Sequence, residues 1–150
     1  MPEVFLRHLD AARNALRFEL WAYVVMPEHV HVLIKPLEAN YSVSEVLSAI
    51  KSPAAREIYR LHPHLREASR IERNNRPPEY RFWQQGGGYD RNLFSVRSIW
   101  NEIHYIHQNP VKRGLCEVPI DWTWTSAGAY AEAGPETFIP VDLCRSGLEW

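Results

Sequence analysis

Two histidines, a tyrosine and an asparagine are the side chains of this 150-residue sequence whose types and spacing could do chemistry. His29 and His31 stand one residue apart in the stretch MPEHVHVLIKP, residues 26–36. The apolar run that begins at Val30 is rich in β-branched residues and predicts a buried strand. Successive side chains of a strand point to opposite faces, so the two imidazoles project side by side, opposite Val30, Val32 and Ile34. Paired imidazoles suit a divalent metal ion or a phosphate group.

The tyrosine and the asparagine belong to the clearest helical pattern of the chain, residues 94–108, which we expect Asn109-Pro110 to end. The apolar stripe of this helix consists of Val96, Ile99, Ile103 and Ile106, with Trp100 beside it. Tyr105 lies roughly 200° around the helix from Ile103, at about 100° per residue. Asn109 follows Tyr105 by four residues and therefore lies on the same polar face. One helix face thus offers a phenol and an amide oxygen together.

These four residues together suit phosphoryl chemistry. His29, His31 and Asn109 could supply three ligands to Mg²⁺ or Mn²⁺ and leave positions open for a phosphate oxygen. Tyr105 would then be the nucleophile, although the sequence names no base for it. Simpler interpretations remain open: polar residues at a strand edge, a hydrogen-bonded surface tyrosine, and an asparagine that caps the helix before Pro110. The histidines that flank the tyrosine, His104 and His107, are expected to be helix-end polar residues or DNA contacts rather than ligands.

The elements that must position these residues are predicted from periodicity and turn signals. We expect a helix over 3–18, strands over 19–26 and 29–35, and a helix that starts at Ser42 with a Ser42–Glu45 capping box. That helix should kink or restart at Pro53 and resume to Leu61. The remaining predictions are a long loop or extended arm over 62–80, a strand over 80–83, a flexible turn at 86–88 and irregular packing beyond 114.

This order of elements predicts one domain over residues 1–150, of the α+β class, with an antiparallel sheet flanked by helices and an irregular tail over 131–150. The longest apolar run is too short to span a membrane. The first residues carry no signal-peptide pattern, and Cys116 and Cys144 have no metal-binding spacing. We therefore expect a cytoplasmic protein with reduced thiols.

Charge is unevenly distributed along the chain, although the net charge is only −1. Residues 51–81 carry eight basic side chains against four acidic ones, a balance of +4. Residues 114–150 carry one arginine against six acidic residues, a balance of −5. A basic middle segment could follow a phosphate backbone. The alternative is a solvated, arginine-rich helix and loop.

Several strings resemble one family. P-E-H-V-H-V-L resembles the HUH motif (His, bulky apolar residue, His) of single-tyrosine HUH endonucleases, and YIHQNPVKRGL, residues 105–115, resembles their tyrosine helix. The match is close to the REP-associated tyrosine transposases, which have strings similar to IKS at 50–52, RFWQ at 81–84 and WTWTSA at 122–127. The resemblance covers about residues 20–130. HxH alone is a weak signal, whereas HxH followed some 75 residues later by the tyrosine string is specific.

The resemblance implies a ferredoxin-like HUH fold and an enzyme that cuts single-stranded DNA beside a hairpin and rejoins it. Tyr105 would form a 5′-phosphotyrosine and release a 3′-OH, with no nucleotide cofactor. His29, His31 and Asn109 would hold Mg²⁺ or Mn²⁺. The DNA contacts that we expect are Lys51, Arg56, Arg81, Trp83, Lys112 and Arg113. Such a protein would work at the nucleoid, as a monomer or a homodimer.

The sequence departs from the family in two respects. Family members usually begin with a strand ahead of the first helix, whereas this chain opens on that helix, so we expect either that the start is truncated or that the sheet lacks one strand. Relatives are also commonly more basic. A non-cutting protein that binds DNA hairpins is therefore the alternative function. A zinc hydrolase of the HxHxDH kind is a poor match, because Leu33 and Ile34 follow the HxH.

Overall fold

The computed structural model describes residues 1–84 and 89–144, and it shows an α+β fold. The helices are α1 (Pro2–Leu16), α2 (Val43–Leu61), α3 (Pro63–Ala68) and α4 (Val96–Lys112); the strands are β1 (Phe18–Val25), β2 (Val30–Pro36), β3 (Arg70–Arg73) and β4 (Arg76–Tyr80); and two 3₁₀ turns follow, η1 (Pro119–Asp121) and η2 (Ala127–Tyr130). The predicted fold class is confirmed. The predicted turn at 86–88 lies outside the described residues. No helix in the described ranges is both long and apolar enough to cross a membrane.

Strands β1 and β2 form an antiparallel hairpin at the centre of the molecule. Pro27 and Glu28 make the turn, which the backbone N–H of Met26 closes by donating to the carbonyl of His29 at 2.8 Å. In the register of this pair, Val24 lies opposite His31. Within residues 1–84 and 89–144 the central sheet consists of these two strands. The predicted strand over 80–83 is wrong beyond Tyr80, where β4 ends.

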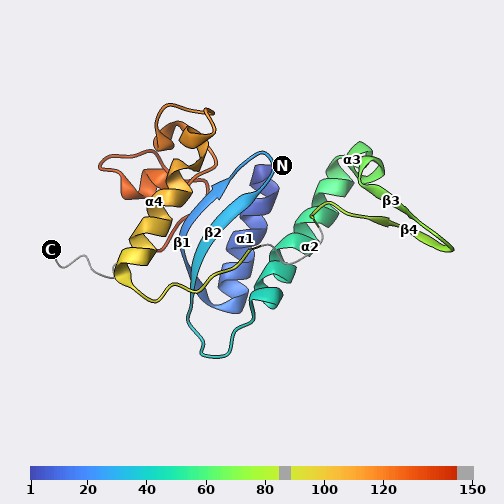
Figure 1. The fold of residues 1–150 in the computed structure, drawn as a ribbon, viewed down its shortest axis with the longest axis horizontal. Helices are drawn as coiled ribbons and strands as arrows, with labels where there is room; N and C mark the ends of the chain where they lie inside the picture. The colour runs from blue at the N-terminus through green and yellow to red at the C-terminus, as the bar shows by residue number, and fades with distance from the viewer. Residues whose placement is uncertain (85–88, 145–150) are drawn as a thin grey trace.

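Helices cover both faces of the hairpin, with α1 and then α2 on one side and α4 on the other (Figure 1). Val30, Val32 and Ile34 of β2 pack with α1 and α2, in a cluster that includes Leu6, Leu9 and Ile50. Leu33 packs on the other face with α4, in a cluster that includes Ile103 and Ile106. The predicted alternation of β2 is therefore confirmed. Because His31 is two residues from Leu33, it faces α4.

The segment from 115 to 144 follows the outer edge of β1. The N–H of Val25 donates to the carbonyl of Trp124 at 2.8 Å, and the N–H of Asp142 donates to the carbonyl of Leu20 at 2.8 Å. Tyr130 donates its hydroxyl to the carbonyl of Trp21 at 2.6 Å. Residues 131–144 contain no helix or strand, yet Ile139 and Cys144 are buried. This segment therefore completes the hydrogen bonding of a buried strand without being a strand itself.

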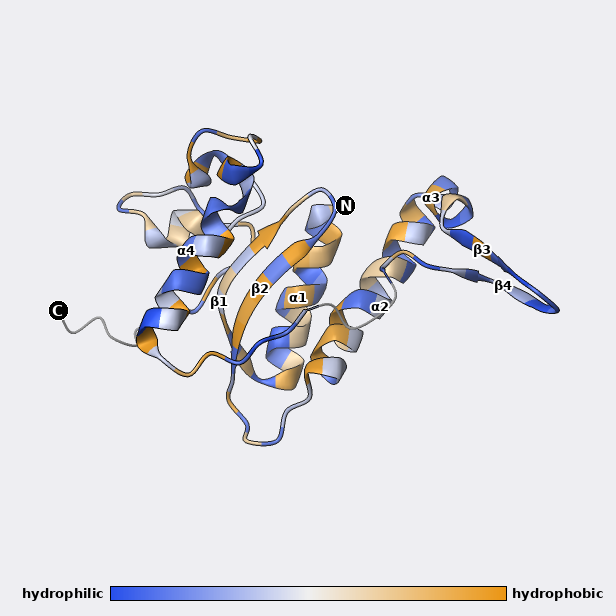
Figure 2. Cartoon of the chain, in the orientation of Figure 1, coloured by the Kyte–Doolittle hydropathy of each residue, from blue (hydrophilic) through white to orange (hydrophobic). Residues whose placement is uncertain are grey.

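Of the two alternatives predicted for residues 62–80, the long loop is wrong and the extended arm is confirmed, because these residues form α3 and the β3–β4 hairpin. This arm, residues 63–80, projects from the end of α2 and is hydrophilic along its strands (Figures 1 and 2). Asn74 and Asn75 make a two-residue turn, with Asn75 at φ 57°, which asparagine tolerates. Every residue of β3 is exposed, so no alternation of apolar and polar residues marks it as a strand.

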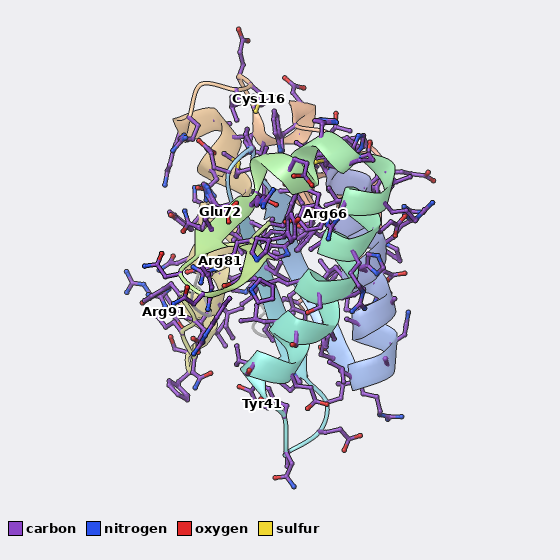
Figure 3. The ribbon with its side chains drawn as sticks, turned by 90° about the vertical axis from the view of Figure 1, so that its right-hand side faces the viewer. Tyr41, Arg66, Glu72, Arg81, Arg91 and Cys116 are labelled. Carbon is purple, nitrogen blue, oxygen red and sulfur yellow. The ribbon has the colours of Figure 1, made fainter. Side chains whose placement is uncertain are left out.

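The β3–β4 hairpin carries exposed charge pairs, which each contribute little, rather than an apolar core. Arg73 pairs with Glu79, and Arg70 pairs with Glu72 at 2.9 Å. The guanidinium of Arg66 lies 4.1 Å above the ring of Tyr80, which connects α3 to β4. Figure 3 shows Arg66 and Glu72 on this part of the molecule, with Arg81 where the chain leaves the hairpin.

Two predicted helix limits need correction. Ser42 caps α2 as predicted and accepts from the N–H of Glu45 at 3.3 Å, but α2 continues through Pro53 as one helix, so the predicted restart is wrong. Helix α4 begins after Ser95 in a capping box with Ser98 and runs through Pro110 to Lys112. The predicted end at Asn109-Pro110 is therefore wrong.

Packing explains why α4 tolerates its proline. Pro110 is fully buried, and its carbonyl accepts from the N–H of Leu115 at 2.9 Å. The helix ends instead where Gly114 takes φ 68°, a conformation that favours glycine after a helix. Val96, which was predicted to face the core, is 44% exposed in the first turn of α4. Phe94 precedes the helix and is also exposed.

Candidate active site

The predicted histidines and tyrosine meet where β2 faces α4. The ring centroids of His29 and His31 are 4.9 Å apart. The ring centroid of Tyr105 lies 5.5 Å from that of His31, edge to face. Tyr105 is 42% exposed, so its hydroxyl is open to a large substrate. Strand alternation and the face of one helix thus bring together three residues that are up to 76 positions apart in the sequence.

His31 has the properties of a side chain that binds a metal ion. Its Nε2 is buried and has no hydrogen-bond partner among the described residues. Burial lowers the pKa of His31, and the charge of His29 lowers it further, while Glu102 acts in the opposite direction. A metal ion binds the neutral imidazole, so a lowered pKa and an unpaired nitrogen both suit a ligand. The histidine pair therefore fits a divalent cation.

Asn109 is placed differently from the prediction that it shares an exposed face with Tyr105. It is 8% exposed, and its Nδ2 donates to the carbonyl of Tyr105 at 2.8 Å. That bond stays within the helix and does not cap it, so the interpretation of Asn109 as a C-cap is wrong. The amide Oδ1 accepts no hydrogen bond within the described ranges. The same ranges contain no cluster of three His, Cys, Asp or Glu side chains that could hold a metal, and Asn109 as a third ligand stays a prediction.

Two basic residues that follow Asn109 also lie at the site. The Nζ of Lys112 is 4.7 Å from the centroid of the Tyr105 ring. Arg113 pairs with Glu28, whose Oε2 is 3.8 Å from Nδ1 of His29. These contacts connect the end of α4 to the turn that carries the first histidine. A cation next to the tyrosine favours an incoming phosphate.

The other predicted DNA contacts come from α2 and from the residues that follow the arm. Lys51 has its Nζ 5.8 Å from the ring of Trp83. Trp83 packs against Phe5 and donates its indole N–H to the carbonyl of Lys51 at 2.8 Å. Its ring is thus used in packing, which leaves less of it for stacking on a base. Arg56 is exposed on α2.

Arg81 lies at the end of the arm, where its Nε donates to Glu79 at 2.8 Å.

Two residues near the site were not predicted, and a third was given a different role. Glu28 contacts His29. The glutamate directly before the histidine in P-E-H-V-H was the sequence signal for this contact, because carboxylates often orient metal-binding histidines. Glu102, one turn before Tyr105, affects the pKa of His31. His107, predicted to be a helix-end polar residue or a DNA contact, is buried, and its Nε2 lies 2.9 Å from Oγ of Ser126. No sequence spacing connects His107 to Ser126, so only the fold reveals that bond.

The chain is similar to known proteins in both sequence and fold. The model of the family described as "Transposase IS200 like" matches residues 2–109. A Haemophilus influenzae protein that carries the name of a REP-associated tyrosine transposase is 27% identical over 109 residues. That alignment covers 73% of this chain and 58% of the relative, so the chain matches less than two thirds of the relative's length.

A solved structure has the same fold. It is a REP-associated tyrosine transposase bound to a REP hairpin, with a TM-score of 0.62 and 19% sequence identity. The alignment covers 96% of this chain and 76% of that one. The bound hairpin is a property of that protein. The family match spans well over half of the 150 residues and includes the histidine pair, the tyrosine and Asn109. The chain therefore belongs to the family of IS200-like transposases.

Proposed function

We propose that this protein cuts single-stranded DNA beside a hairpin and rejoins it through a covalent bond to Tyr105. The observation that carries the proposal is the cluster of His29, His31 and an exposed Tyr105, with one buried imidazole nitrogen left unpaired. A protein that only bound DNA would have no need for such a cluster. The substrate is chromosomal DNA, so the protein works at the nucleoid in the cytoplasm.

In the proposed reaction, the hydroxyl oxygen of Tyr105 forms a bond to the phosphorus of a DNA phosphate. The bond from that phosphorus to the 3′ oxygen breaks, and the 3′ oxygen leaves as a hydroxyl with a proton, while the tyrosine proton passes to solvent. The DNA 5′ phosphate remains on the enzyme as a phosphotyrosine. Attack by a 3′-OH on this bond reverses the reaction, so no nucleotide cofactor is consumed.

The chain's residues divide the work. Lys112 lies over the Tyr105 ring and would attract the phosphate, while Asn109 fixes the turn of helix that carries the tyrosine. His29, His31 and Asn109 would hold Mg²⁺ or Mn²⁺, which would neutralise charge on the phosphate. Lys51, Arg56, Arg81 and Arg113 would contact the phosphate backbone. The proposal applies to a monomer as well as to a homodimer.

A covalent-adduct assay tests this function. The purified chain is mixed with Mg²⁺ or Mn²⁺ and a labelled single-stranded oligonucleotide that carries a hairpin from the DNA beside its own gene. The mixture is then denatured in detergent. We expect a labelled protein band that is lost without metal and lost in Tyr105→Phe. A retarded complex on a native gel without any covalent band would support a non-cutting hairpin-binding protein instead.

A further inference from the structure

We propose that a cavity beside His31 encloses one unpaired nucleotide of the DNA strand and reads its base. The cavity lies between β2, α2 and residues 89–94, which we call the strap because they lead across to α4 (Figure 1). Its volume is about 310 Å³, at the lower end of the range for ligand pockets. The inference rests on the proposed function and adds to it a site for one base.

The walls of the cavity suit the flat face of a base. Val32 and Ile34 of β2 and Val43 and Leu47 of α2 line it. Leu47 is only half-buried and belongs to none of the buried core clusters. Enzymes that enclose a single nucleotide hold its base between apolar or aromatic side chains. The apolar walls therefore supply the contact that does not depend on base identity.

Polar groups at the same cavity can read the edge of the base. Tyr41 donates its hydroxyl to Oδ1 of Asn92 at 3.4 Å, and Asp90 and Glu102 also belong to the lining. Carboxylates accept hydrogen bonds from the exocyclic amino groups of bases, and asparagine pairs with adenine. Thymine has no amino group. We therefore expect a preference for adenine, cytosine or guanine over thymine.

The charges of the lining suit a nucleotide, which carries a phosphate as well as a base. Lys51 forms no ion pair among the described residues and lies at the wall. Arg91 pairs with Glu102 at 2.6 Å, which leaves the cation of Lys51 for a phosphate. Tyr41 and Arg91, which Figure 3 labels, come from the loop before α2 and from the strap.

A second, larger cavity of about 520 Å³ borders His29 and is lined by aromatic residues. Its described lining includes Glu28 but no lysine or arginine, so its charge is less suited to a nucleotide. The cavity beside His31 also has the better connection to the reacting groups. His31 and Ile106 belong to its lining, and Tyr105 is 5.5 Å from His31. The enclosed nucleotide would therefore stand next to the phosphate that Tyr105 attacks.

A binding selection on full-length Tyr105→Phe tests the inference without requiring cleavage. The probe is a hairpin from the DNA beside the gene, with about six randomised single-stranded nucleotides on each side, and the retained molecules are sequenced. We expect one flanking position to be depleted of thymine. Removing the base at that position should weaken binding by roughly tenfold, the typical contribution of one stacked base.

Leu47→Trp fills the cavity, and Leu61→Trp places the same side chain at an exposed position on the same helix. The preference should disappear in Leu47→Trp and persist in Leu61→Trp, with both variants showing the thermal unfolding of the parent. Asn92→Leu should change the preferred base at the same position even if Leu47→Trp does not fold. If Leu47→Trp and Asn92→Leu both retain hairpins with the base preference of the parent, this inference is overturned but the proposed function is not. Failure of the parent to retain any hairpin would overturn the proposed function too.

Discussion

Burial sets the protonation of two histidines near the tyrosine, with different consequences. His31 is half-buried and keeps an unpaired Nε2, and its lowered pKa favours the neutral imidazole, which is the form that binds a metal ion. His107 is buried against Ser126, and burial lowers its pKa from 6.5 to about 4, with a further effect of His104. The nitrogen of His107 is satisfied inside the protein, so this histidine contributes to stability rather than to chemistry. His107 is part of α4, whereas His31 faces α4 and lines a cavity.

The buried His107 should make stability depend on pH. The unfolded chain binds a proton on this residue below pH 6.5, whereas the folded chain does so only near pH 4. The stability is therefore complete above 6.5 and is lost as the pH falls toward 4. The free energy of unfolding in urea should decrease by about 2 kcal/mol between pH 7 and pH 5 through this residue.

His107→Asn provides the control for that prediction, because it removes the titrating group while keeping a polar partner for Ser126. The difference in stability between the two pH values should be smaller in the variant by about the same 2 kcal/mol. If wild type and variant lose stability in parallel, the folded pKa of His107 is not lowered.

At the scale of elements, α4 does more than carry Tyr105. It places Tyr105 next to His31 and buries Ile103 and Ile106 in the core. It also places Lys112 over the tyrosine ring. The residue pairs that stabilise these positions are three, four and seven residues apart, as the helical repeat requires. A second element, the long α2, connects the cavity wall to the arm. The two helices stand on opposite faces of the hairpin.

The basic stretch over α2 and the arm should contribute long-range attraction to DNA. Arg56 and Arg76 form no ion pair in the described part of the chain. We expect the double variant Arg56→Ala/Arg76→Ala to reduce the slope of log binding constant against log salt by roughly 1.4, at about 0.7 for each phosphate contact of a single strand.

Lys35→Ala is the matched control for this series, because Lys35 is exposed but lies 3.6 Å from Glu19 at the far end of β2. Its slope should equal that of the parent chain. An equal slope in the double variant would show that the DNA does not follow this part of the molecule. Binding is measured by fluorescence anisotropy with the hairpin oligonucleotide over a range of salt concentrations.

At the scale of the whole molecule, the chain beyond α4 is part of the fold even though the family match stops at residue 109. It supplies backbone partners for Leu20, Tyr23 and Val25, all in the buried strand β1. An unpaired buried backbone group costs about as much as a lost hydrogen bond. The tail therefore stabilises the strand that in turn positions His31.

Ending the chain at Leu115 should abolish cooperative unfolding, because several backbone groups of β1 would lose their partners and the core would lose Ile139 and Cys144. Tyr130→Phe removes a hydroxyl that donates to the carbonyl of Trp21 and accepts from the N–H of Cys144, and it should cost only about 2 kcal/mol. Circular dichroism during thermal unfolding measures both. A cooperative transition in the shortened chain would show that the tail is dispensable.

The sequence by itself determined the local features. Period-two alternation put His29 and His31 on one side of a strand and Val30, Val32 and Ile34 on the other, and the structure confirms the side on which each valine packs. The limits of α1, β1 and β2 and the Ser42 cap were predicted closely for the same reason: each depends on residues within about five positions.

Only the tertiary structure decided the features that depend on distant partners. Helix α4 continues through Pro110 because burial of that residue outweighs a missing N–H. The strands of the arm carry charge pairs and leave no apolar pattern in the sequence. Asn109 is buried although its helical position is polar. His107 is hydrogen-bonded to Ser126, and His31 lines a cavity together with residues of the strap. No local spacing in the sequence indicates either contact. The physical reason is that burial, which sets these contacts and pKa values, is a property of the packed layers and not of any one segment.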